Sequence, residues 1–125
     1  MPDAKIPETL FAPAERASRG EVGRQAKAVA RAPQLSQMLD QVPDLLLVLN
    51  SHRQAVFCNQ RLLDLLGLDS LEPILGQRPG ELMNCVHCQE MAGGCGTSES
   101  CRHCGAALAI LASLEGRREV RECRL

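Results

Sequence analysis

The sequence contains no tryptophan and no tyrosine, and its aromatic side chains are limited to Phe11 and Phe57. So few rings give no stacking surface of the kind that binds single-stranded nucleic acid. The formal net charge of -1 provides no basic field for a phosphate backbone either. We therefore expect no nucleic-acid partner. The apolar residues are mostly Leu, Ala and Val, which favour packed helices and a small sheet over an aromatic-rich β-sandwich.

Long apolar runs are also missing. The longest one, Leu45–Leu49, is far too short to span a membrane. Residues 1–21 are polar and lack the apolar core of a secretion signal. We therefore expect a cytoplasmic protein without a membrane span, in a compartment where thiols stay mostly reduced.

The chain of 125 residues is long enough for one domain with a modest core. Residues 1–20 are rich in proline, alanine and charge, a composition typical of a disordered segment. Residues 21–43 contain two amphipathic helical patterns, Glu21–Ala32 and Leu35–Val42, which we interpret as a helical linker. Residues 44–125 are predicted to form a partial domain.

The partial domain begins with a predicted β-hairpin. Two apolar runs, Leu45–Asn50 and Ala55–Asn59, are joined by a short polar loop. Asn59 is a good N-cap for a short helix that should end at Gly67. The leucines of this helix are expected to form its buried side: Leu62, Leu63, Leu65 and Leu66.

The rest of the domain is predicted to hold an irregular region, a longer helix and a last strand. The helix should run from Gly105 to Glu115 and the strand should lie near Val120. The predicted fold class is therefore α+β, with an antiparallel sheet of about three strands, flanking helices and an N-terminal helical extension.

Five of the seven cysteines crowd into the loop formed by residues 85–104: Cys85, Cys88, Cys95, Cys101 and Cys104. They include two C-x-x-C pairs separated by twelve residues. Such pairs let two sulfurs converge on one metal ion, and the second pair lies at the start of the predicted helix. An odd number of cysteines in a reducing compartment argues against a disulfide framework.

Two metal centres suit this donor set. Zinc takes four thiolates, or three thiolates and one imidazole from His87 or His103. A [4Fe–4S] cluster also takes four cysteines. Five thiols compete for four places, and we assign Cys101 and Cys104 first, then Cys85, then Cys88 and Cys95 equally. Cys58 and Cys123 stand alone on predicted strands and are interpreted as core residues.

Two other interpretations of the cysteines stay open. They can act as free thiols, either inert or in reversible redox sensing. A thiol oxidoreductase would use one C-x-x-C pair at a helix start, but no βα strand precedes "ESCRHCGAALAIL". No Ser-His-Asp set, phosphate-binding loop or paired carboxylates is visible, so we expect no catalytic activity in this chain.

Two stretches, "LLLVLNSHRQAVFCNQRLLDLLGL" and "CGAALAILASLEGRREVRECRL", resemble the first two thirds of a PAS sensory domain. Within that superfamily, "RPGE…C.HC…GGCGTSESCRHCGA" resembles a cysteine-bearing bacterial group found in sensor histidine kinases and other signalling proteins. The resemblance implies a sensory module for redox or oxygen, because some oxygen-sensing PAS kinases carry an iron–sulfur cluster on two C-x-x-C pairs. We expect neither flavin, because the Arg-Phe-Leu-Gln pattern does not follow "NCVHC", nor haem.

The resemblance also implies a sheet of five antiparallel strands, of which this chain supplies about three. We expect either a fragment or a sheet that a partner completes. The partner would be a second copy of the chain or an output domain, bound through the N-terminal helix and the open sheet edge.

Overall fold

The structure is a computed structural model that describes residues 6–123. The described chain forms two compact units. We call residues 17–77 the hairpin unit, and we call residues 6–16 together with 78–123 the cysteine unit. Within these residues no helix is both long enough and apolar enough to cross a membrane.

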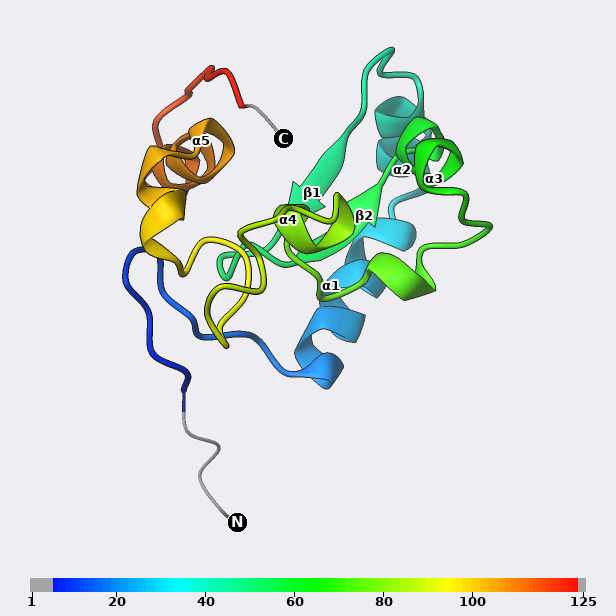
Figure 1. The fold of residues 1–125 in the computed structure, drawn as a ribbon. Helices are drawn as coiled ribbons and strands as arrows, with labels where there is room; N and C mark the ends of the chain where they lie inside the picture. The colour runs from blue at the N-terminus through cyan, green and yellow to red at the C-terminus, as the bar shows by residue number, and fades with distance from the viewer. Residues whose placement is uncertain (1–5, 124–125) are drawn as a thin grey trace. The chain divides into compact units, whose positions relative to one another are not determined.

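The hairpin unit is built on the predicted β-hairpin. Strands β1 (Leu47–Leu49) and β2 (Ala55–Cys58) pair antiparallel, with Leu47 opposite Cys58 and an irregularity between Val48 and Leu49 (Figure 1). Every residue of β2 is buried. The backbone of Ala55 also exchanges hydrogen bonds of 2.7 and 2.9 Å with Gln77 and Gly76, so both edges of β2 have partners.

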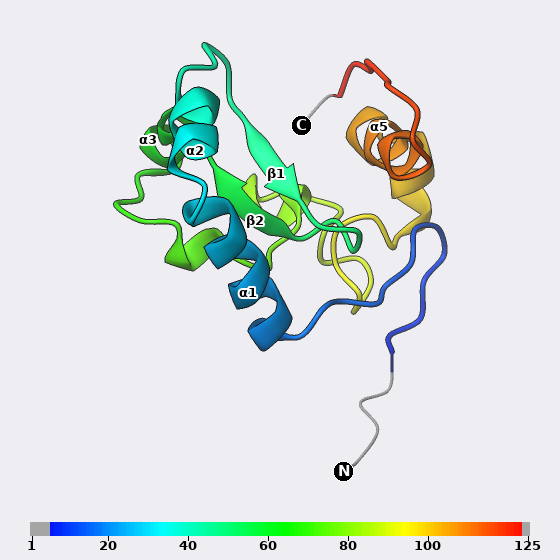
Figure 2. The same cartoon turned by 180° about the vertical axis from the view of Figure 1, so that it is seen from behind.

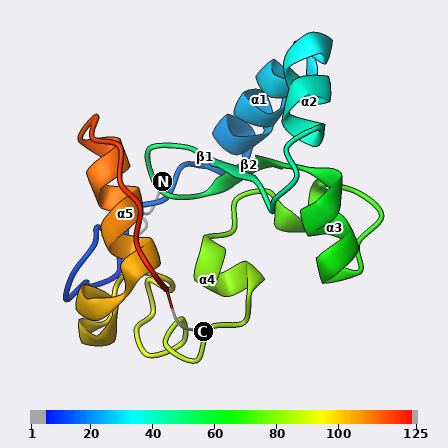
Figure 3. The same ribbon diagram turned by 90° about the horizontal axis from the view of Figure 1, so that it is seen from above.

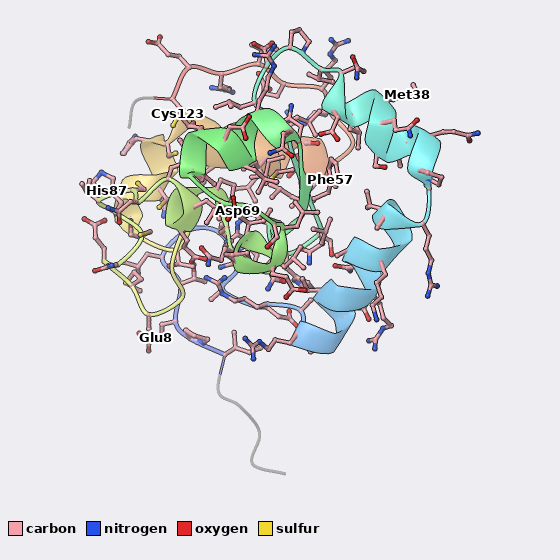
Figure 4. The ribbon with its side chains drawn as sticks, turned by 90° about the vertical axis from the view of Figure 1, so that its right-hand side faces the viewer. Glu8, Met38, Phe57, Asp69, His87 and Cys123 are labelled. Carbon is pink, nitrogen blue, oxygen red and sulfur yellow. The ribbon has the colours of Figure 1, made fainter. Side chains whose placement is uncertain are left out.

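Both predicted N-terminal helices are confirmed. Helix α1 (Arg19–Ala30) begins at the N-cap Ser18, and helix α2 (Pro33–Asp40) begins with a proline at its first turn. Helix α1 packs on β2 and contacts α2 (Figures 2 and 3). The outer face of α2 stays open: the side chain of Met38 points away from the ribbon and is 69% exposed (Figure 4).

Helix α3 (Gln60–Leu66) confirms the predicted cap at each end. Asn59 accepts from the Leu62 amide, and Gly67 adopts a left-handed conformation with φ 69°. Leu62 and Leu63 are buried as expected, but Leu65 is 59% exposed, so its predicted burial is wrong. At 100° per residue, Leu65 lies at the edge of the apolar stripe, on the side away from Leu63. A single 3₁₀ turn, η1 (Glu72–Ile74), follows.

The cysteine unit contains little regular structure. Its elements are helix α4 (Pro79–Leu82), the 3₁₀ helix η2 (Glu99–His103) and helix α5 (Gly105–Leu114). Helix α5 confirms the predicted long helix. Leu114 on α5 is exposed, as expected for a helix with incomplete cover.

The α+β fold class is confirmed, but the strand predicted near Val120 is wrong. Residues 117–123 form no strand in the described structure. Five of these seven residues are charged and Val120 is exposed, so the segment has no apolar face to lay on a sheet. It runs back along α5 instead (Figure 3).

Part of the N-terminal segment pairs with the cysteine loop through its backbone. Residues 6–18 contain no helix or strand, yet the amides of Leu10 and Ala12 donate to the carbonyls of Thr97 and Gly96 at 2.8 and 2.9 Å. Ala12 and Ala14 are buried. The predicted division into residues 1–20, 21–43 and 44–125 concerns sequence segments and stays a prediction.

Asn59 holds the hairpin unit together through a fully buried amide. Its oxygen accepts from the amides of Leu46 and Leu62, and its nitrogen donates to the carbonyl of Asp44 at 2.7 Å. We expect Asn59→Ala to lower the free energy of unfolding by about 3 kcal/mol, because a cap and several buried partners are lost together. Urea unfolding measures this.

The control is Gln37→Ala, which truncates an exposed amide side chain on α2. It should change the free energy of unfolding much less. Asn59→Asp keeps the acceptor but replaces the donor to Asp44, so it should fall close to Asn59→Ala. Equal stability of Asn59→Ala and the parent protein would contradict this account of the hairpin unit.

Candidate functional site

The cysteine unit is organised around Arg78, the residue directly before α4. Its side chain is 0% exposed. The guanidinium donates to the carbonyl of Gly93 at 3.0 Å and to that of Glu15 at 2.7 Å, and more weakly to those of Pro13 and Ala14. A cation out of water is stable only when hydrogen-bonded in this way. Arg78 therefore joins the N-terminal segment to the middle of the cysteine loop.

Glu81 on α4 forms the second junction. Its carboxylate binds the guanidinium of Arg16 through both oxygens, and it accepts from the amides of Arg78 at 3.0 Å and Cys95 at 3.2 Å. Burial alone would raise the pKa of Glu81. The hydrogen bonds from Arg16, Arg78 and Cys95, with the charge of Arg16, outweigh burial and hold that pKa below its usual value.

Gly80 leaves room for two cysteine side chains to lie against the first turn of α4. A Cβ atom there would lie 2.8 Å from the Cys95 sulfur and 3.3 Å from the Cys85 Cβ. The Gly80 amide donates to that Cys95 sulfur at 3.2 Å. Cys95 and Cys85 therefore both lie close to a position where only glycine leaves room, which the spacing of the cysteines did not reveal.

The first C-x-x-C pair lies in the turns after α4, where Cys85 and Cys88 are half-buried. Burial raises the pKa of the Cys88 thiol, and the neighbouring charges of Cys85, Glu81 and Cys101 raise it further, against a lowering by the Cys88 backbone amide. The Cys88 thiol is therefore less readily deprotonated than a free cysteine thiol.

The second pair lies in η2 and at the start of α5. Cys101 is buried and its sulfur is 3.3 Å from the Ser98 hydroxyl. Cys104 is the N-cap residue of α5 and is half-buried. Its sulfur lies 3.8 Å from the sulfur of Cys123.

The two isolated cysteines have different outcomes. Cys58 on β2 is buried, which confirms it as a core residue; burial, and then the charge of Asp40, raises the pKa of its thiol. Cys123 is exposed, so its interpretation as a core residue is wrong. The strand that would have buried it does not form, and it lies instead beside Cys104.

The histidines within the pairs are not enclosed among the thiols. His103 is exposed. His87 is half-buried, and its Nδ1 lies 3.1 Å from the Glu90 carboxylate. Hydrogen bonds from His87, Ser98 and Ser100 lower the pKa of Glu90. That His87 or His103 binds a metal in place of one cysteine stays a prediction.

The donor set fits a soft metal in its chemistry, because thiolates are the ligands that zinc and iron–sulfur clusters prefer. The positions of these donors do not form a complete metal site. Among residues 6–123, no three His, Cys, Asp or Glu side chains lie together closely enough to hold a metal ion. Binding would therefore have to draw the two C-x-x-C pairs together.

Comparison with known families places this fold. A family model described as a PAS domain matches residues 34–99, more than half of the chain. The chain therefore belongs to the PAS-domain family, a family of sensory modules in signal transduction. The matched region includes Cys85, Cys88 and Cys95 and stops before Cys101. Neither the curated proteins nor the solved structures give a match.

The pH dependence of stability should reveal the Glu81 junction. The pKa of Glu81 is lower in the folded protein than the ordinary value near 4.3, so ionised Glu81 stabilises the fold above about pH 4.3. This stabilisation is lost as the pH falls through the lower folded value. Glu81→Gln should cost about 1–2 kcal/mol at pH 7 and much less at pH 3. Urea titrations at the two pH values measure the difference.

The control for this measurement is Glu99→Gln. Glu99 also binds an arginine, Arg102, but its side chain is 63% exposed, so its loss should change stability little at either pH. A Glu81→Gln cost that is the same at pH 3 and pH 7 would contradict the assignment of this junction to the ionised carboxylate.

Proposed function

We propose that this PAS module senses redox state or oxygen through a thiolate-bound metal centre in the cysteine unit, either a [4Fe–4S] cluster or a single zinc ion. The observation that carries the proposal is the gathering of five thiols, two C-x-x-C pairs and Cys95, on one loop of the cysteine unit. In the described residues these donors do not form a complete site, so metal binding would draw the two C-x-x-C pairs together.

The ligands that we assign are Cys85, Cys88, Cys101 and Cys104. Burial, and then the charges of neighbouring groups, raise the pKa of Cys88, and a bound cation would favour the thiolate against both. Cys95 is the thiol that we assign as spare. Its sulfur already accepts a hydrogen bond from Gly80 and lies against the backbone there.

The bound centre would supply either an electron-transfer site, for a cluster, or a structural staple, for zinc. The chain's own residues hold the ligands in place. Arg78 and Glu81 fix the middle of the loop through the carbonyl of Gly93 and the amide of Cys95. Ser98 orients the Cys101 sulfur. A change of charge at the thiols would then act on a loop that has few apolar contacts of its own.

A partner would receive the signal. PAS domains often act by dimerising or by binding an output domain, and α2 offers Leu35 and Met38 as exposed apolar side chains. We infer that this face of α2 binds a second copy or an output domain.

The ligand assignment predicts the metal content of variants. Anaerobically purified protein should contain zinc, or iron with sulfide, and Cys101→Ser and Cys104→Ser should lose it. Cys58→Ser and Cys95→Ser should keep the content of the parent protein. Elemental analysis with an ultraviolet–visible spectrum measures both. Unchanged metal content in Cys101→Ser, or no metal in any preparation, would contradict the proposal.

Metal removal should also loosen the cysteine unit. A ligand that binds only the folded state adds about 2.7 kcal/mol at a concentration near one hundred times Kd. Chelation should therefore lower the melting temperature and speed proteolysis between Gly76 and Ser100. Loss of the metal with no change in melting or proteolysis would show that the centre does not stabilise this loop.

A further inference from the structure

The sulfurs of Cys104 and Cys123 form a thiol pair that lies outside the cysteine motif. They are 3.8 Å apart. A disulfide has its sulfurs about 2.05 Å apart, so bond formation needs an approach of less than about 2 Å. Cys104 precedes α5, and Cys123 comes from the segment that runs back along it (Figures 3 and 4).

The backbone of residues 121–123 passes very close to the start of α5, and this approach places the two thiols side by side. The carbonyl oxygen of Glu122 lies only 1.8 Å from the point where a Cβ atom on Gly105 would stand. The Cβ atom of Arg121 lies 3.4 Å from the same point. Because Gly105 has no side chain, residues 121–123 can cross the start of α5 at this distance and bring Cys123 to Cys104.

The pair is also accessible to an oxidant. Cys123 is exposed and Cys104 is half-buried, whereas Cys101 and Cys58 are buried. An accessible thiol with a second thiol beside it is the arrangement of a reversible redox site, because the second thiol can trap the oxidised form of the first as a disulfide.

We propose that Cys104 and Cys123 are a modification site that forms a reversible disulfide in response to a hydroperoxide. The Cys123 sulfur attacks a peroxide oxygen, the O–O bond breaks, and the leaving oxygen takes the thiol proton, departing as water from hydrogen peroxide or as an alcohol from an organic hydroperoxide, to give a sulfenic acid. The Cys104 sulfur then attacks the Cys123 sulfur, the S–O bond breaks, and a water leaves. Two thiols are oxidised by two electrons and one hydroperoxide is reduced; a dithiol reductant reverses the reaction.

This inference goes beyond the proposed metal centre, because the disulfide needs only two sulfurs and no metal. It also connects the two: a disulfide withdraws Cys104 from the ligands that we assign. Metal content is therefore measured beside disulfide formation, so that failure of one proposal is distinguished from failure of the other.

The test is peptide mapping of the full chain after treatment with hydrogen peroxide. The protein is used as purified and after dialysis against a chelator, with elemental analysis to show that the dialysed sample is free of zinc and iron. Trypsin places Cys104 in residues 103–117 and Cys123 in residues 122–124, apart from the other five cysteines. The metal-free protein should yield these two peptides as one cross-linked species, and dithiothreitol should separate them.

Two variants test whether the cross-link depends on the contact between Cys104 and Cys123. Two controls test whether removing another thiol, or another glycine, has the same effect. The cross-link should be lost in Cys123→Ser, which changes an exposed residue. It should also be lost in Gly105→Ala, which keeps both thiols but leaves no room for Glu122. Cys95→Ser, at the thiol that we assign as spare, and Gly23→Ala should keep it, and Gly23 lies in α1 with nothing within 4 Å of an added Cβ. Absence of the cross-link from metal-free parent protein, or its full yield in Gly105→Ala, would overturn the proposal.

Discussion

The cysteine unit depends on a buried cation. Arg78 is fully buried, and its guanidinium donates to carbonyls of the N-terminal segment and of Gly93. Hydrogen bonds to a charged group contribute roughly 1.5–3 kcal/mol each, and a desolvated cation requires them. The N-terminal segment buries small side chains such as Ala12 and Ala14, whose apolar area is too small to fix it alone. The hydrogen bonds of the guanidinium therefore fix the N-terminal segment, as apolar packing does in a larger domain.

The positions of several thiols depend on glycines, which let other atoms approach the backbone closely. Gly80 lies against the sulfur of Cys95, and Gly105 lies beneath the carbonyl of Glu122. The first brings Cys95 close to Cys85, and the second brings Cys123 close to Cys104. The arrangement of sulfurs thus depends on backbone approach as much as on the number of residues between cysteines, which is why a motif search alone assigns Cys123 no role.

The elements that could be predicted from the sequence are those with local causes. The hairpin, the Asn59 cap and α5 follow from apolar runs and from capping residues within a few positions. The strand near Val120 could not be judged from local sequence, because a strand also needs the edge of another strand, distant in the sequence, with which to pair. The burial of Arg78 could not be predicted because an arginine in a turn is ordinarily solvated. Three of the carbonyls that bind it come from residues more than sixty positions away.

The two units differ in what can disturb them. The hairpin unit is held by uncharged amides, such as those of Asn59 and Gln54, whose hydrogen bonds do not change with pH or oxidants. The cysteine unit is held by an ionised carboxylate and surrounded by thiols, and both change their chemistry with conditions. Protonating Glu81 would weaken its bonds to Arg16 and to the Cys95 amide together. In the function that we propose, the hairpin unit would therefore keep its fold while the cysteine unit responds.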